Sequence, residues 1–355
     1  MAAITNLLKG ILEWIYTIIA NYGWSIVVFT LLIKLLLIPL DIKNRKGMRK
    51  MAKIQPELNK LQKKYANDKQ KLQQKQSELM RKERYSPMAG CLPLLIQMPI
   101  LFAMFGAMRA IANEQIVHQV FTFLTGETPV YEGWLWVKNI WAADSLFASV
   151  APDVNAIRAI TNDVWQQIYQ TLSSEQVQLI VQNISAHVED FNAAGLDFSS
   201  AQTLKELMPS MVLTLQQMPT YIAQTAAMPG WGNMNFFLFT VSVFQQYNGY
   251  LILPITAGLS QVLMTKVTPG ATGAAPSTLT TEQAGTSQQA PGMGGFMKYF
   301  FPLFSVYITL TSNAGFALYW VVSNLLATAM NILITRYYDQ KEKLEAAAKG
   351  EVQTQ

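Results

Sequence analysis

The stretch FTLLIKLLLIPL, from Phe29 to Leu40, places one charged residue, Lys34, among apolar side chains. It belongs to a longer apolar segment, residues 22–42, which reaches the roughly 18 residues that a membrane span requires. Because the bilayer core holds no water to pair with backbone N–H and C=O groups, such a segment must be helical. Only 14% of the 355 residues are charged, against about 25% in average soluble domains. The sequence therefore predicts an all-α, polytopic membrane protein.

Five membrane spans are expected, at residues 22–42, 87–112, 249–267, 298–313 and 314–336. Residues 1–21 show helical apolar spacing with Lys9 and Glu13 in between. This pattern predicts an amphipathic helix on the membrane surface, and a helix packed on the other spans fits equally well. Met1–Ala20 also lacks the features of a signal peptide. The single cysteine, Cys91, cannot form a disulfide within the chain, and we interpret it as a buried apolar residue.

Charge asymmetry predicts the topology of these spans. Residues 43–84 carry fifteen Lys or Arg and four acids, whereas residues 113–248 carry three Lys or Arg and eleven acids. Because basic loops stay on the cytoplasmic side, segment 43–86 is expected inside and 113–248 outside. The N-terminus is then outside, and the flexible linker 268–297 and the tail 337–355 are cytoplasmic, in a bacterial plasma membrane.

The basic segment 43–86 is expected to form a cytoplasmic helical hairpin. Ile54, Leu58 and Leu61 follow a narrow helical stripe, and Asn67–Asp68 supply a turn and a helix cap. Its surface could contact nucleic acid, anionic lipid or a partner protein, although the positive-inside rule alone explains most of the charge. Since no aromatic residues alternate with the basic ones, we expect no sequence-specific nucleic-acid binding, and weak contact with ribosomal RNA stays open.

The second span contains three residues that interrupt its apolar character. Pro93 and Pro99 each remove a backbone hydrogen bond, which predicts kinks in this helix. Gln97 lies between them and either ties two helices together or faces a hydrated cavity, the structural tie being favoured. Ser86 and Pro87 are typical of a helix N-cap and first turn.

Lys34 is the most costly residue in the spans, because an ionised lysine at mid-bilayer costs about 2.5–3.5 kcal/mol on insertion scales. It lies eight residues from Ile42, about 12 Å along a helix, which is farther than its side chain reaches. No acidic partner is evident at mid-bilayer depth. We therefore expect Lys34 to face a hydrated pocket open to the cytoplasm, with Thr30 one turn before it on the same face.

Five sequence blocks together resemble the YidC family of membrane-protein insertases, which includes the mitochondrial oxidase-assembly and chloroplast albino-type insertases. The blocks are SIVVFTLLIKLLLIPL, the hairpin MRKMAKIQPELNKLQKKYANDKQKL, SPMAGCLPLLIQMPILF, LILPITAGLSQVLMTKVTP and FALYWVVSN. The resemblance runs from about 22 to 144 and from 250 to 337. It implies a five-helix core with a hydrophilic groove that is open to the cytoplasm and to lipid.

The resemblance also implies the groove residues. Lys34 stands where the family usually has Arg, so the charge is kept but the bidentate fork is lost. Thr30 and Gln97 match groove residues, and Trp320 matches an aromatic that contacts incoming helices. Asn313 stands where the family usually has Pro, so the turn between the last two spans is expected to differ.

The implied function is non-enzymatic insertion of nascent hydrophobic segments into the bilayer, alone or with the Sec translocon. The implied partners are nascent membrane proteins and membrane lipids, with the ribosome and the translocon as further candidates, and no cofactor or metal is expected. Two other classes stay open: an anion transporter or channel that uses Lys34, and a membrane scaffold. Transporters usually show half-helix repeats, which are not evident here.

Residues 146–247, approximately, form an insert in the outer loop, where the family has a short connection. Helices are expected at 153–170, 174–191 and 199–226, with Ser174 as an N-cap. His118 and His187 are too isolated to indicate zinc, and no nucleophile–base pair is evident. We therefore expect a small helical extracytoplasmic domain without catalytic chemistry.

Overall fold

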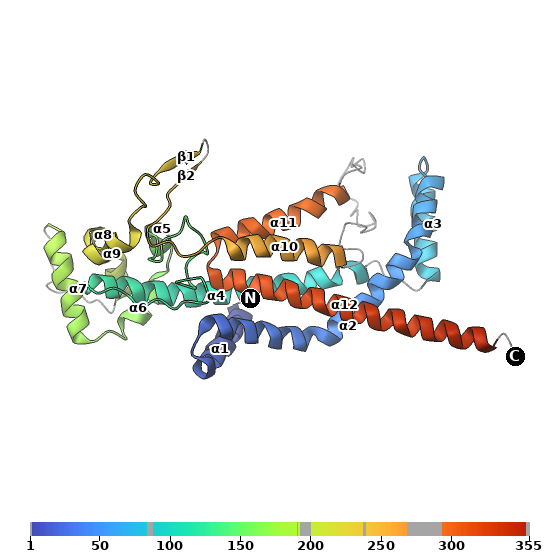
Figure 1. Ribbon diagram of the computed structural model, residues 1–355, viewed down its shortest axis with the longest axis horizontal. Helices are drawn as coiled ribbons and strands as arrows, with labels where there is room; N and C mark the ends of the chain where they lie inside the picture. Colours follow the sequence, from blue (N-terminus) through green and yellow to red (C-terminus); the bar gives the residue numbers. More distant parts are fainter. Residues whose placement is uncertain are drawn as a thin grey trace. The chain divides into compact units, whose positions relative to one another are not determined.

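The computed structural model describes residues 2–83, 88–189, 191, 200–236, 239–267 and 293–352. It is mostly helical (Figure 1). The main helices are α1 (Ala2–Ile19), α2 (Tyr22–Lys64), α3 (Lys69–Lys82), α4 (Met88–Leu124), α10 (Ile252–Val267), α11 (Met293–Thr311) and α12 (Ala314–Val352).

The chain divides into two compact units. The insert-bearing unit comprises Met1–Val27, Ala103–Ile255 and Tyr307–Tyr319. The hairpin-bearing unit comprises Val28–Phe102, Thr256–Val306 and Trp320–Gln355.

Four helices among the described residues are long and apolar enough to cross a membrane. They lie at Ala2–Ile19, Tyr22–Lys43, Met98–Leu124 and Ala314–Glu345, whereas Ile252–Val267 and Tyr299–Thr311 are shorter apolar helices. The all-α, polytopic fold is therefore confirmed. The five-span topology and its assignment to the two sides of a membrane stay predictions.

Three expected segment ends are not helix ends. Helix α2 continues past residue 42 to Lys64, α4 continues past residue 112 to Leu124, and α12 continues past residue 336 to Val352. A helix satisfies its backbone hydrogen bonds internally in lipid and in water alike, so a change of hydropathy does not stop it. Ser86 and Pro87 lie outside the described residues.

Helices α2 and α3 form a hairpin in the structure, and its cytoplasmic location stays a prediction. Asp68 caps α3 by accepting a hydrogen bond from the backbone N–H of Lys71 at 3.0 Å. Ile54 and Leu58 of α2 pack with Met80 of α3 in a small apolar cluster. The predicted stripe of α2 therefore forms one side of this contact, and Met80, which the stripe did not include, forms the other.

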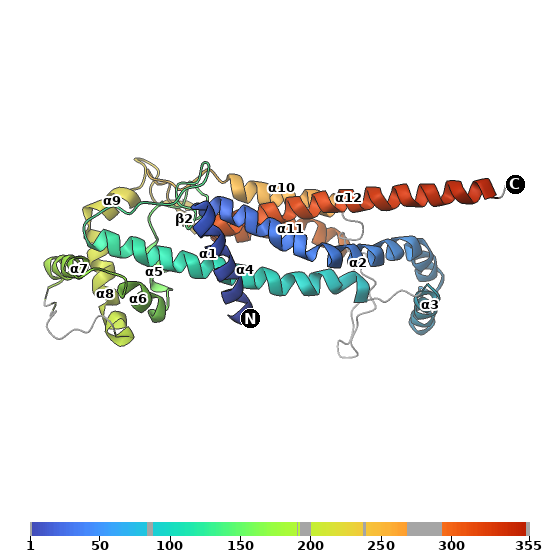
Figure 2. The ribbon, with the colours of Figure 1, turned by 90° about the horizontal axis from the view of Figure 1, so that it is seen from below.

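Helices α10, α11 and α12 approach one another in the hairpin-bearing unit (Figures 1 and 2). Gly258 of α10 lies against α11, because a Cβ atom added there would lie 2.6 Å from Cγ2 of Val306. Small residues allow such close approach between membrane helices. On α12, Asn324 reaches α10 through two side-chain hydrogen bonds.

The insert folds around the end of α4. Its elements are α5 (Val154–Arg158), α6 (Asn162–Tyr169), α7 (Ser174–His187), α8 (Ala201–Gln217), α9 (Pro219–Thr225), β1 (Met234–Phe236) and β2 (Phe239–Val241). Trp165, Ile184 and Leu215 share one apolar core with Phe121 and Phe123 of α4. The extended α4 therefore supplies one side of the core of this domain.

The expected helices of the insert require four corrections. Segment 199–226 forms two helices, because Met218 ends α8 and α9 begins at Pro219. Segment 153–170 forms two helices, because Ala159 ends α5 and a new helix starts after Thr161. The N-cap of α7 is Ser173 rather than Ser174, since only Ser173 forms the reciprocal capping box with Gln176, three residues later. Strands β1 and β2 also form an antiparallel pair that a wholly helical domain does not contain.

The first and last residues of the insert lie next to each other. The backbone N–H of Val150 donates to the carbonyl oxygen of Gln246 at 2.9 Å, and that of Asn248 donates to Ala148 at 2.8 Å. The buried side chain of Asn248 also donates to the carbonyl oxygen of Asn139 at 2.8 Å. Adjacent ends are typical of a domain inserted into a connecting loop.

Helix α1 presents two faces. Leu8, Leu12 and Ile15 are buried, whereas Leu7, Trp14 and other large apolar side chains of the opposite face are exposed. Lys9 forms an ion pair with Glu114 of α4. The helix thus packs against protein on one side and leaves an apolar side available for lipid.

Candidate functional site in the hairpin-bearing unit

Lys34 and Thr30 lie on the covered face of α2. Thr30 is 1% exposed and Lys34 is 9% exposed, whereas Leu36 is 74% exposed. Leu32 and Leu35 are also exposed. The ammonium therefore belongs to the protein-facing side of the helix, and snorkelling along a lipid-facing surface does not describe it.

The sequence predicts a hydrated pocket around Lys34, and this pocket stays a prediction. In the structure the side chain of Lys34 is mostly covered, and Lys34 takes part in an interaction within the protein.

A second set of polar side chains lies between α10 and α12. The Asn324 amide donates to Ser260 Oγ at 3.1 Å and to Gln261 Oε1 at 3.1 Å. Thr328 and Asn331 continue the polar face of α12 at helical spacing, and both are buried. These residues were not identified from the sequence, although polar residues recurring every three or four positions in an apolar helix would have indicated them.

The other predicted site residues lie on α4 and α12. Trp320 is half-buried on α12, and Pro99 is exposed on α4. Gln97, Pro93 and Cys91 belong to the helical backbone of α4, but their side chains lie outside the described residues. Their roles, and the kinks at the two prolines, stay predictions.

The outward faces of these helices are apolar. Leu259 of α10, Leu303 of α11 and Leu333 of α12 are each more than 60% exposed. Polar groups inside and leucines outside are the arrangement that a lipid environment favours, because lipid offers polar groups no partners.

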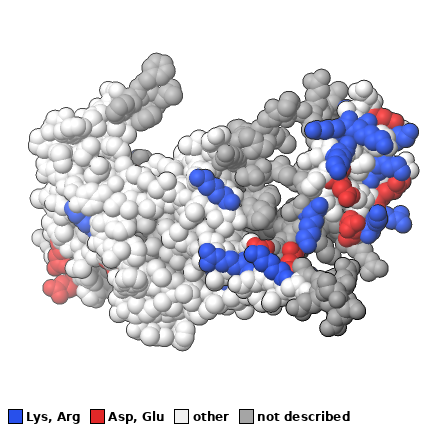
Figure 3. Space-filling model, turned by 45° about the vertical axis from the view of Figure 1, so that its right-hand side comes forward, with Lys and Arg blue, Asp and Glu red and all other residues white. Residues whose placement is uncertain are grey.

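Basic side chains gather on the hairpin of α2 and α3, as Figure 3 shows on the side of the molecule turned forward. Lys60, Lys64, Lys71 and Lys82 are among its exposed residues. Lys53 of α2 also pairs with Glu342 of α12 at 2.9 Å. In the described part of the chain, no group of three or more His, Cys, Asp or Glu side chains is arranged to hold a metal ion.

The fold and the polar faces define a polytopic α-helical membrane protein with charge concentrated in one hairpin. The sequence pattern of the 60Kd inner membrane protein family matches residues 14–214 and 201–342, so the chain belongs to this family.

Two of the similar proteins are named as membrane protein insertases. The chain is 48% identical over 114 residues to a protein of Fusobacterium nucleatum subsp. nucleatum named "Membrane protein insertase YidC", covering 31% of this chain and 56% of that protein. It is 42% identical over 153 residues to the protein of that name from Clostridium perfringens, covering 41% of this chain and 58% of the relative. The chain thus spans somewhat more than half the length of these two relatives.

Proposed function

We propose that this protein inserts hydrophobic segments of nascent proteins into the bilayer from the cytoplasm. The observation that carries the proposal is the covered position of Lys34 and Thr30 on a helix whose opposite face is apolar. Family membership and the names of the relatives support the same function.

The proposed groove is lined by Lys34, Thr30 and Gln97, with Trp320 beside the path of the incoming helix. Polar side chains there would replace part of the hydration that a polar tail loses when it leaves water. The apolar part of the substrate then moves directly into lipid, and hydrophobic transfer supplies the driving force. This process makes and breaks no covalent bond, so we propose that the protein is not an enzyme.

The lysine sets the selectivity of this groove. A carboxylate on the substrate tail is attracted by an ammonium group, but an ammonium does not impose the bidentate geometry of a guanidinium. We therefore expect general attraction of acidic tails by Lys34 rather than recognition of one carboxylate arrangement.

The remaining parts of the proposal concern partners and location. The basic hairpin would contact the incoming chain, the ribosome or anionic headgroups on the cytoplasmic side. The Sec translocon is a further candidate partner. The location proposed is a bacterial plasma membrane, with the N-terminus outside and the C-terminus in the cytoplasm.

The test is insertion of a single-span substrate with an acidic outer tail into liposomes that contain the purified protein. We expect Lys34→Met to reduce insertion several-fold and Lys34→Arg to retain it. Lys266→Met is the matched control, because Lys266 is an exposed lysine in the last turn of α10. Protease protection of the substrate tail measures insertion.

Two results would contradict the proposal. Equal insertion by the Lys34→Met and wild-type proteins would remove the role of the lysine. Anion flux through the same liposomes, abolished by Lys34→Met and present without any substrate, would instead favour the channel alternative.

A further inference from the structure

We propose that the turn at residues 134–137 anchors the protein in the membrane surface at the N-terminal end of α2, with Leu135 inserted into lipid. The backbone N–H of Trp134 donates to the carbonyl oxygen of Val137 at 2.8 Å, and that of Val137 donates to Trp134 at 3.0 Å. This reciprocal pair closes a turn with Leu135 and Trp136 at its tip. Leu135 is 66% exposed whereas Val137 is buried, so the turn presents its leucine to the surroundings.

The backbone of Leu135 is strained. Its φ angle is +52°, in the left-handed region that a leucine rarely adopts. When the first central residue of a two-residue turn has a positive φ, it is usually glycine, asparagine or aspartate. Residues held in unfavourable backbone regions persist only where the surrounding structure fixes them, and they are often functional. Here the strained conformation carries an apolar side chain that the protein leaves uncovered.

Three contacts fix the turn beside the first residues of α2. The Asn21 side chain donates to the carbonyl oxygen of Gly133 at 3.2 Å. The ring of Trp134 lies edge-on to the ring of Trp24, with 5.6 Å between their centroids. Trp134 also lies directly against Gly23, where an added Cβ atom would be 2.1 Å from its Cδ1 atom. The turn therefore has a defined position at the start of this helix.

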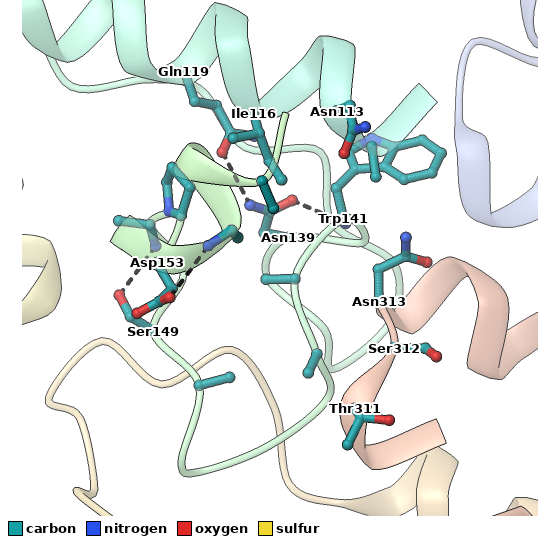
Figure 4. A pocket seen from close by; sticks show the side chains of 18 of the residues that line it. Asn113, Ile116, Gln119, Asn139, Trp141, Ser149, Asp153, Thr311, Ser312 and Asn313 are labelled. Carbon is teal, nitrogen blue, oxygen red and sulfur yellow. Dashed lines mark hydrogen bonds between the residues drawn. The ribbon is translucent and has the colours of Figure 1, made fainter. Parts of the chain in front are cut away.

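The chain that follows the turn is fixed as well. The buried side chain of Asn139 donates to the carbonyl oxygen of Val150 at 2.8 Å and accepts from the backbone N–H of Trp141 at 3.0 Å. Figure 4 shows this side chain pointing to Gln119 of α4 and to Trp141. Because both flanks of the turn are bound to protein, Leu135 is held outward by the fold.

The surface that adjoins the turn identifies lipid as the partner. Helix α2 is long and apolar enough over Tyr22–Lys43 to cross a membrane. Exposed apolar side chains form a stripe along it at helical spacing: Trp24, Val28, Leu31 and Leu35. The stripe begins at Trp24, whose ring contacts Trp134. We therefore place Leu135 at the end of a lipid-facing surface.

The tryptophans of the turn suit a membrane–water interface, where the amphipathic indole ring is enriched. Trp134 and Trp136 flank Leu135, and both are partly exposed. Nε1–H of Trp136 donates to Asp144 at 3.1 Å, so the polar group of this ring is already satisfied and its apolar part is left for lipid.

An anchor at this position would set the depth of α2 in the bilayer. Lys34 follows Trp24 by ten residues on the same helix, a rise of about 15 Å. The middle of the hydrocarbon core lies about 15 Å from its edge. The turn would thus hold Lys34 at the depth where a charge is rarest.

The experiment uses the full-length protein in liposomes of phosphatidylethanolamine and phosphatidylglycerol, with a nitroxide label on one introduced cysteine. Cys91, the only cysteine of the chain, is first removed by Cys91→Ser. Leu135→Cys carries the label at the turn, and Leu213→Cys, at an exposed leucine of α8, is the matched control. We expect oxygen to relax the label at position 135 several-fold more strongly than a water-soluble nickel chelate does. The label at position 213 should show the reverse order.

Two outcomes of the labelling would overturn the proposal. Equal accessibility of the two positions to the nickel chelate would place the turn in water. A label at position 135 that is shielded from both reagents would mean that protein covers the turn, for example a second copy of the chain.

The wild-type protein provides a second test that does not depend on the folding of cysteine variants. A phospholipid with a diazirine near the headgroup end of its acyl chain is activated by light in the same liposomes, and mass spectrometry locates the adducts. We expect adducts on residues 134–137 and on the exposed stripe of α2, and none on α8. Adducts on α2 without adducts on the turn would refute the anchor. Neither measurement includes a substrate, so both are independent of the proposed insertase function.

Discussion

The core of the insert and the polar faces of α2, α10 and α12 bury opposite chemistry. In the insert, Trp165, Ile184 and Leu215 are covered, as expected for a domain in water. On α2 the covered side chains include Thr30 and Lys34, while Leu36 is exposed. The insert therefore buries apolar side chains, as a domain in water does. Helix α2 instead covers polar side chains and exposes leucine, as a helix in lipid does.

The largest expected effect is the loss of a core side chain in the insert. Trp165→Ala should lower the free energy of unfolding of this domain by about 3–5 kcal/mol, because the cavity left behind is not refilled. Urea unfolding followed by protease sensitivity of the insert measures the loss. Trp231→Ala is the matched control, since Trp231 is 53% exposed, and it should stay within about 0.5 kcal/mol of wild type.

The second largest effect is expected on the exposed apolar face of α2. Leu36→Asp places a carboxylate on the exposed face of α2 and should cost about 2.5–3.5 kcal/mol if that face meets lipid. The yield of protein integrated in the membrane, measured by resistance to alkaline extraction, should fall. Leu213→Asp makes the same change on exposed α8 of the insert and should be tolerated. Equal losses for both variants would mean that the two faces meet the same solvent.

A smaller effect is expected inside the polar cluster. Asn324→Leu removes the hydrogen bonds to Ser260 and Gln261, and such bonds between membrane helices contribute about 0.6 kcal/mol on average. The thermal midpoint in detergent should fall slightly. A double-mutant cycle with Gln261→Leu isolates the pair, and strict additivity of the two changes would show that the amides do not interact.

Hydropathy and charge were sufficient to predict the helical membrane fold and the α2–α3 hairpin. They did not predict where α2 and α4 end, because solvent changes along these helices while their internal hydrogen bonds continue. The turn at Asn67–Asp68 was predictable, since cap chemistry is local.

The candidate site was predictable only in part. Lys34 is conspicuous because a charge in an apolar run is costly, whereas Gln261 and Asn324 become meaningful only when two distant helices are adjacent. Asn313 illustrates the same limit: its side chain accepts a hydrogen bond from the N–H of Phe316 at 2.9 Å. Asn313 therefore caps α12. The resemblance to the YidC family had indicated only that Asn313 stands where the family usually has proline.

The smallest effect concerns the junction between the insert-bearing loop and the start of α2. Glu132 accepts a hydrogen bond from the backbone N–H of Tyr22, a carboxylate position that the helix N-terminus favours. Burial nevertheless raises the pKa of Glu132 above its ordinary value of 4.5. Because the folded state binds this proton more tightly, its stabilising contribution is complete below pH 4.5 and is lost as pH rises through the raised pKa.

Glu132→Gln should therefore abolish this component of the pH dependence, since glutamine keeps an acceptor oxygen and does not titrate. Thermal unfolding in detergent, followed from pH 4 upward, should show a shallower decline for the variant than for wild type. Glu175→Gln, at an exposed acid in the first turn of α7, should retain the wild-type profile. Parallel profiles for the wild-type and Glu132→Gln proteins would mean that this carboxyl is hydrated, and that the covered surface of the insert-bearing unit ends before the first turn of α2.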